Sequence, residues 1–138
     1  MKHQAGHIIT ITQQDIGRLS AVVSRYAEID DEATAALQEE LDRAEVVSQN
    51  AVSPHIVTMN SRVVCRDART RASRELQVVY PWHADTGAGK ISVLAPLGRA
   101  LLGATTGDTL RVEAGGHVRS WLVESIEYQP ESAGDLDL

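Results

Sequence analysis

The spacing of apolar residues changes once along this chain, and that change divides it into two parts. Up to about residue 47 apolar side chains recur at three- and four-residue intervals, as on one face of a helix. After residue 55 they fall into short runs with a period near two. The stretch between, residues 48–55, holds Asn50, Ser53 and Pro54 and follows neither period. We therefore predict two domains, a helical one over residues 1–50 and a strand-rich one over residues 51–138.

The first part predicts two helices joined by an acidic turn. Thr12 is a favourable N-cap for the first helix, because Asp15 stands at the third helical position behind it. Asp30 or Asp31 can cap the second helix. The apolar positions of the two helices are Ile16, Leu19, Val22, Val23, Tyr26, Leu37, Leu41 and Ala44. With roughly 15 residues in each helix, we expect a short antiparallel helical hairpin, or coiled coil, that extends about 20 to 25 Å.

The second part predicts strands, because its apolar and β-branched residues alternate with polar ones. The strand-like runs cover residues 56–58, 63–65, 76–80, 91–94, 109–112 and 119–128. A short helix is predicted from Pro96 to Leu102, with Gly103 in the helix-terminating position. The predicted fold class is α+β, with a short N-terminal antiparallel helical hairpin and a C-terminal antiparallel sheet that carries one short helix.

Charge and cysteine content narrow the range of functions. The chain has 13 basic and 19 acidic residues, a net charge of −6. Nonspecific affinity for nucleic acid comes from neutralising phosphates with Lys and Arg, so nucleic acid is not the expected primary partner and no sequence-specific contact with it is expected. The single cysteine, Cys65, can form neither an internal disulfide nor a thiolate zinc site, which favours the cytoplasm. The apolar run at residues 8–11 is too short for a signal peptide or a membrane span.

Catalytic motifs are missing from the sequence. The histidines stand singly, without an HxH or HExxH pattern, at positions 3, 7, 55, 83 and 117. There is no GxSxG elbow, and the segment 103–108 lacks the lysine of a phosphate-binding loop. Asp108 is expected instead to accept backbone hydrogen bonds in a turn between helix and strand. We predict that the protein is not an enzyme and uses no catalytic residue, metal ion or cofactor.

Two charged clusters are candidate contact sites. Four carboxylates surround the turn between the predicted helices: Glu28, Asp30, Asp31 and Glu32. They can hold a hard cation such as Mg²⁺, but helix capping accounts for the same residues. Four arginines lie between the second and third predicted strands: Arg66, Arg69, Arg71 and Arg74. They form either a solvated loop or a basic surface for an acidic partner.

The segment 91–103, followed by the Thr-Thr-Gly-Asp run at 105–108, resembles the C-terminal domain of the Gre transcript-cleavage factors of bacterial RNA polymerase. More narrowly, four separate segments are similar to the regulator of nucleoside diphosphate kinase family, which is itself Gre-like. These segments are residues 40–44, 57–63, 79–81 and 127–135. They occur in the family's order, which makes the match specific. The resemblance covers nearly the whole chain.

The resemblance implies an FKBP-like C-terminal domain that docks at the rim of the polymerase secondary channel, with the coiled coil pointing into that channel. It implies a transcription regulator that binds RNA polymerase and competes with Gre factors without transcript cleavage. We separately expect a monomer. Nucleoside diphosphate kinase would then be affected indirectly. Gre factors have a longer coiled coil whose tip carboxylates reach the active-site Mg²⁺, and a reach of about 20 to 25 Å is too short for the same role.

The polymerase-binding residues that the resemblance implies are Leu94, Ala95, Pro96, Leu97 and Arg99. Where the Gre pattern carries an acidic residue and Ser before the proline, this chain has Leu94 and Ala95, which predicts a more apolar contact. Leu94 and Leu97 are also candidates for the hydrophobic core. Two alternatives stay open: a cleavage factor that uses the acidic tip, and an FKBP-like prolyl isomerase. The second is opposed by an aromatic content of 4% without any Phe.

Overall fold

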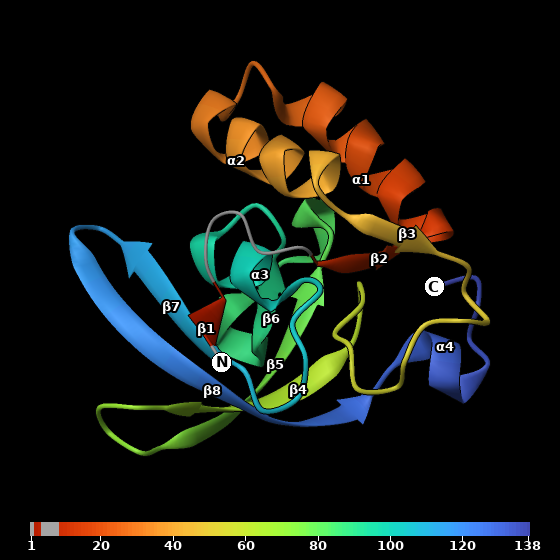
Figure 1. The fold of residues 1–138 in the computed structure, drawn as a ribbon. Helices are drawn as coiled ribbons and strands as arrows, with labels where there is room; N and C mark the ends of the chain where they lie inside the picture. Colours follow the sequence, from red (N-terminus) through yellow and green to blue (C-terminus); the bar gives the residue numbers. More distant parts are fainter. Residues whose placement is uncertain (1, 4–8) are drawn as a thin grey trace.

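The computed structural model describes residues 2–3 and 9–138, and it begins with a short helical hairpin. Helices α1 (Gln13–Tyr26) and α2 (Asp31–Asp42) lie side by side and run in opposite directions (Figure 1). The Thr12 side chain accepts a hydrogen bond from the backbone N–H of Asp15, which confirms the predicted N-cap. For α2 the cap is Asp30, whose carboxylate accepts from the backbone N–H of Ala33 at 3.1 Å.

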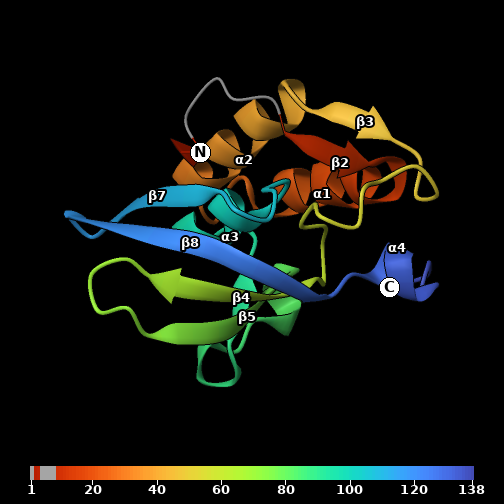
Figure 2. The same ribbon diagram turned by 60° about the horizontal axis from the view of Figure 1, so that its bottom comes forward.

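The larger part of the chain forms a curled sheet of six strands among the described residues (Figure 2). Its strands are β1 (Lys2–His3), β4 (Arg62–Asp67), β5 (Ser73–Val79), β6 (Lys90–Ser92), β7 (Thr109–Ala114) and β8 (His117–Tyr128). Their order across the sheet is β1-β7-β8-β4-β5-β6. The central pairs β7–β8, β8–β4 and β4–β5 are antiparallel, as predicted, while β1 and β6 add parallel pairs at the two edges.

A second, small sheet joins the two ends of the helical hairpin. Strand β2 (Thr10–Thr12) enters α1, strand β3 (Glu45–Val47) leaves α2, and the two strands pair in parallel. Of the apolar run at 8–11, residue 8 lies outside the described residues. The chain then follows turns without a regular element until β4 begins at Arg62. This irregular stretch includes the predicted linker at 48–55.

The predicted strand at 56–58 is wrong. Ile56 forms only an isolated bridge with Thr105. Val57 instead pairs with the turn after α3, donating to Ala104 O at 2.8 Å and accepting from the N–H of Gly103 at 2.9 Å. The β-branched residues signal extended backbone, but the partner of this segment is a turn and cannot extend the ladder.

The predicted short helix is confirmed as α3 (Pro96–Leu101), and Gly103 after it has a positive φ of 77°. Asp108 accepts a hydrogen bond from the backbone N–H of Thr105 at 2.9 Å, so its predicted turn role is also confirmed. The remaining helices are short: η1 (Pro81–His83), η2 (Thr86–Ala88) and α4 (Pro130–Ala133). No helix in the described part of the chain has the length and apolar character needed to cross a membrane.

The inner face of the helical hairpin packs onto the sheet part of the molecule. Leu19 and Leu37 of the hairpin share one hydrophobic core with Met59, Val93 and Leu101. In Figure 1 the hairpin lies across the curled sheet, with α3 beneath it. The hairpin therefore does not stand free of the molecule over the 20 to 25 Å expected from about 15 residues per helix, because its apolar stripe is buried against the second part. The division at residue 50 stays a prediction.

Candidate functional site

The segment 94–99, for which the sequence predicts docking and which is here called the docking segment, is positioned by the end of β6. Its first residue donates a backbone hydrogen bond to the hydroxyl of Ser92 at 3.1 Å, and the N–H of Ala95 donates to Ser92 O at 3.0 Å. Gly98 lets α3 approach this strand closely, because a Cβ there would lie 2.0 Å from Ser92 O. The docking segment is thus held against the sheet by backbone contacts.

The docking segment and the acidic tip of the helical hairpin face each other across a groove of about 370 Å³. The groove is lined by Asp30, Glu32, Ala33, Ser92, Leu94, Ala95, Pro96 and Arg99. Two clusters that the sequence analysis singled out separately therefore form the two walls of one site. Leu97 is partly buried and packs against the core, and Leu94 combines such core contact with a place in the groove wall.

Arg99 links the two walls electrostatically. Its guanidinium donates a hydrogen bond to Leu94 O. Burial lowers the pKa of Arg99, while the carboxylates of Asp30, Glu32 and Glu40 act in the opposite direction. An arginine with several carboxylates nearby stays protonated, so the groove combines a fixed cation with acidic groups from the hairpin.

All four tip carboxylates are exposed, and Asp30 in addition caps α2, as described above. Among the described residues, no group of three or more His, Cys, Asp or Glu side chains is arranged to hold a metal ion. Ile29, at the same turn, is 77% exposed.

The four arginines of the predicted loop lie at the β4–β5 turn, away from the groove lining. Arg66 pairs with Glu124 of β8. Arg69, Arg71 and Arg74 are exposed. Arg119 of β8, which the sequence analysis did not single out, joins them through an ion pair with Asp67. No local pattern marks Arg119, because only strand pairing brings it to this turn.

The aromatic rings do not gather into one pocket. Tyr80 and Trp82 stack at 5.3 Å and line a hollow of about 480 Å³ together with Arg18. Trp121 is buried with the Arg119 guanidinium 5.0 Å from its ring centre, and Tyr128 lines another hollow. The histidines are also dispersed and exposed at positions 55, 83 and 117, while position 7 falls outside the described residues.

Comparison with known protein families agrees with this architecture. The family model for the C-terminal domain of transcription elongation factors GreA and GreB matches residues 52–128, and the model named Rnk N-terminus matches residues 8–47. The chain belongs to the GreA/GreB family of transcription factors. This confirms the resemblance found in the sequence.

The chain is also similar to individual proteins of known family. The regulator of nucleoside diphosphate kinase of Escherichia coli K12 is 38% identical over 128 residues, which cover 92% of this chain and 94% of that protein. GreA of Chelativorans sp. BNC1 is 34% identical over 92 residues, 67% of this chain but only 59% of that protein. The solved structure of a GreA/GreB elongation factor from Nitrosomonas europaea has a TM-score of 0.75 at 36% identity, covering 87% of this chain and 99% of its own.

Proposed function

We propose that the protein docks on bacterial RNA polymerase at the entrance of the secondary channel and competes there with Gre factors without promoting transcript cleavage. Membership of the GreA/GreB family supports polymerase as the partner. The match to a regulator of nucleoside diphosphate kinase along 92% of the chain supports a regulatory role. In this proposal the level of nucleoside diphosphate kinase changes indirectly, through transcription.

The docking face is the groove wall formed by Leu94, Ala95, Pro96 and Arg99. These side chains are partly exposed, and the three apolar ones form a short surface beside one guanidinium. An apolar patch with an arginine at its edge has the composition of a protein–protein contact. Because the acid and Ser of the Gre pattern are replaced here, the contact depends on apolar burial and on Arg99.

Two observations support the absence of cleavage in this proposal: the helical hairpin is short, and its acidic tip lines a groove together with the molecule's own docking segment. With 14 and 12 residues, the two helices are about 21 and 18 Å long, and their inner face is buried in the core. Asp30 is engaged as a helix cap and Glu32 lies across the groove from Arg99. A hairpin of this length, with its inner face packed in the core, supports a tip that does not extend to a metal ion deep inside a channel.

A competition assay tests the proposal. Labelled GreA bound to core RNA polymerase is titrated with this protein, and transcript cleavage in arrested complexes is followed in parallel. We expect displacement of GreA together with loss of cleavage. Binding without displacement, or no binding at micromolar protein, would reject the proposed docking position.

A matched pair of variants at one position tests the docking face. Ala95 is the N-cap of α3 and makes no side-chain capping hydrogen bond. Both Ala95→Ser and Ala95→Asp supply a capping oxygen, so both are expected to fold, but only the second adds a charge. We expect Ala95→Ser to displace GreA as the wild type does and Ala95→Asp to lose displacement. Equal displacement by both would remove this segment from the contact.

The exposure of Glu28 and Asp31 favours one second candidate, a cleavage factor that uses these two carboxylates. The variant Glu28→Gln with Asp31→Asn keeps Asp30 and therefore keeps the α2 cap. If the protein stimulates cleavage and this variant does not, the second candidate is correct. If neither does, the competitor without cleavage stands. A prolyl isomerase is not favoured, because the aromatic rings lie in separate places.

A further inference from the structure

A second surface lies at one end of the sheet, between two hairpin turns. The β4–β5 turn and the β7–β8 turn point to the same side of the molecule, on the left in Figures 1 and 2. The backbone N–H of Ala68 donates to Ser120 O at 2.9 Å, which joins the first turn to β8. Between the turns is a hollow of about 540 Å³ lined by Arg69, Thr70, Ala114, His117, Val118 and Arg119.

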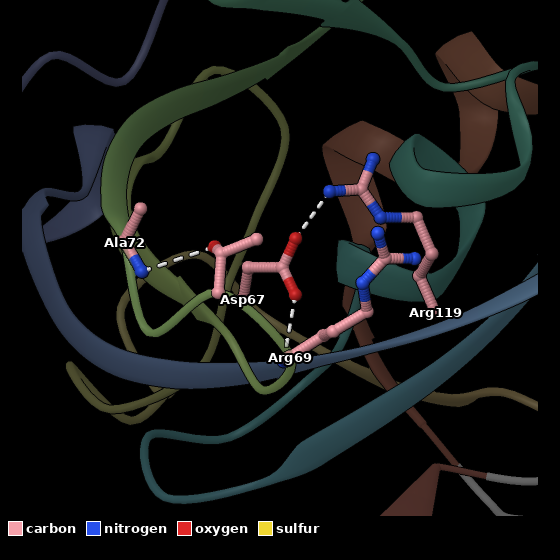
Figure 3. Close-up of polar contacts among 5 residues, drawn as sticks. Asp67, Arg69, Ala72 and Arg119 are labelled. Carbon is pink, nitrogen blue, oxygen red and sulfur yellow. Dashed lines mark hydrogen bonds and ion pairs between the residues drawn. The ribbon is translucent and has the colours of Figure 1, made fainter.

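One buried carboxylate organises this end of the sheet. Asp67 is 3% exposed and accepts a hydrogen bond from the backbone N–H of Arg69 at 2.9 Å. Its other oxygen forms an ion pair with Arg119 (Figure 3). The Arg69 amide and the Arg119 guanidinium together hold the pKa of Asp67 below its usual value. Figure 3 shows the Arg69 and Arg119 side chains on the same side of Asp67, so the carboxylate aligns two arginines.

Three further positive charges at this end are not neutralised by an ion pair. Arg66 is paired with Glu124 and Arg119 with Asp67. Arg69, Arg71 and Arg74 are exposed, and within the described part of the chain none of their guanidinium groups has a carboxylate partner. We call these three residues, with Arg119, the arginine end. On a protein of net charge −6, such a concentration of positive charge is local and unbalanced.

The surroundings of the arginine end decide which partner it fits. Of the large apolar side chains that are exposed in the described part of the chain, only Val118 lies there, at 45% exposure. Protein interfaces are built around a buried apolar or aromatic centre, which this surface does not offer among the described residues. Its aromatic ring, Trp121, is buried beneath Arg119 and cannot stack on a base. Guanidinium groups without such neighbours suit phosphates, which need only charge and hydrogen-bond donors.

We infer that the arginine end binds the phosphate backbone of a nucleic acid, without reading its base sequence. This goes beyond the docking proposal, since it uses different residues and needs no polymerase. The overall negative charge keeps the contact weak for the free protein. It becomes useful once another surface holds the protein next to a nucleic acid, because the effective local concentration is then high.

The test measures binding of fluorescein-labelled DNA duplexes and RNA strands by anisotropy, with two unrelated sequences of each. Three phosphates neutralised by three free arginines give a salt slope near −2.7, so affinity for the duplex is expected to fall about 40-fold between about 50 and 200 mM salt. Both sequences should bind equally. The variant Arg69→Gln/Arg71→Gln/Arg74→Gln should lose at least about tenfold in affinity at low salt and most of the salt slope.

The matched control removes the same charge elsewhere. Arg25, Arg62 and Lys90 are exposed and lie outside the arginine end, so Arg25→Gln/Arg62→Gln/Lys90→Gln has the same net charge as the test variant. We expect this control to keep the wild-type salt slope. Equal losses in both triple variants would overturn the inference, because only net charge would then matter. No binding at about 100 µM protein in low salt would also overturn it. Binding of a poly-glutamate peptide but not of nucleic acid would assign the surface to an acidic protein instead.

Discussion

The carboxylate of Asp15, in the first turn of α1, accepts a hydrogen bond of 3.1 Å from the backbone N–H of Met59. The two residues are 44 positions apart, and both are almost fully buried. This bond ties the helical hairpin to the segment that leads into the sheet. Because burial makes a carboxylate hard to ionise, the position of Asp15 between the two parts makes their packing sensitive to pH, although the Met59 hydrogen bond itself favours the ionised form.

Stability is expected to fall as pH rises through the range in which Asp15 ionises. Burial, the main cause, raises the pKa of Asp15 from 3.8 to about 6. The folded protein therefore binds more protons than the unfolded chain between about pH 4 and 6, and its free energy of unfolding decreases with pH in that window. From pH 4.5 to 7 this group alone should lower that free energy by about 2 kcal/mol.

The variant Asp15→Asn isolates this effect, because the amide oxygen can still accept from Met59 but does not titrate. Urea unfolding at pH 4.5 and at pH 7 measures the free energy of unfolding of both proteins. From pH 4.5 to pH 7, that of the variant should rise by about 2 kcal/mol relative to that of the wild type. A constant difference between the two proteins at both values would mean that Asp15 is already ionised at pH 4.5.

Two glycines in helices should respond in opposite directions to alanine. At Gly98 the new methyl group would meet Ser92 O at 2.0 Å, so Gly98→Ala should destabilise the protein by about 1–3 kcal/mol and displace α3. At Gly17, in α1, a Cβ would meet nothing within 4 Å. Gly17→Ala should therefore stabilise by about 0.5–1 kcal/mol. Urea midpoints measure both changes, and a neutral Gly98→Ala would contradict the close packing of α3.

The acidic tip contains a matched pair of neighbours with different roles. Asp30→Ala removes the cap of α2 and should cost about 1 kcal/mol of stability, whereas Asp30→Asn keeps an accepting oxygen and should cost little. Asp31→Ala, at an exposed position, should change stability by less than about 0.5 kcal/mol. Thermal unfolding distinguishes the three variants. Equal losses for Asp30→Ala and Asp31→Ala would show that charge at the turn matters more than the cap.

Asp67 is expected to control the order of the β4–β5 turn. Replacing it with Ala removes the acceptor of the Arg69 amide and the partner of Arg119. Amide hydrogen exchange at neutral pH should then become faster at Arg69. Thr70→Val is the control, since it removes only the hydroxyl that accepts from the Ala72 amide at 3.2 Å. That variant should speed exchange at Ala72 and leave Arg69 protected. Unchanged exchange at Arg69 in Asp67→Ala would contradict the organising role of this carboxylate.

Local patterns predicted most of the elements correctly, because helix caps and apolar periods act over a few neighbouring residues. Thr12, the α3 helix and the turn at Asp108 were all predicted from the sequence and are present in the structure. The strand at 56–58 was wrong, since its β-branched residues meet a turn. The edge pairs β1–β7 and β5–β6, which are parallel, could not be read from strand-like runs alone.

By itself, the sequence determined the fold class, the family resemblance and the residues of both charged clusters. Only the tertiary structure decided how those residues meet. It placed Asp30 and Glu32 across a groove from Arg99, and it brought Arg119 to Asp67 from 52 positions away. The reason is physical. Helix caps and the spacing of apolar residues depend on near neighbours in the sequence. Contacts between distant residues depend on strand order and on the burial of apolar faces against one another.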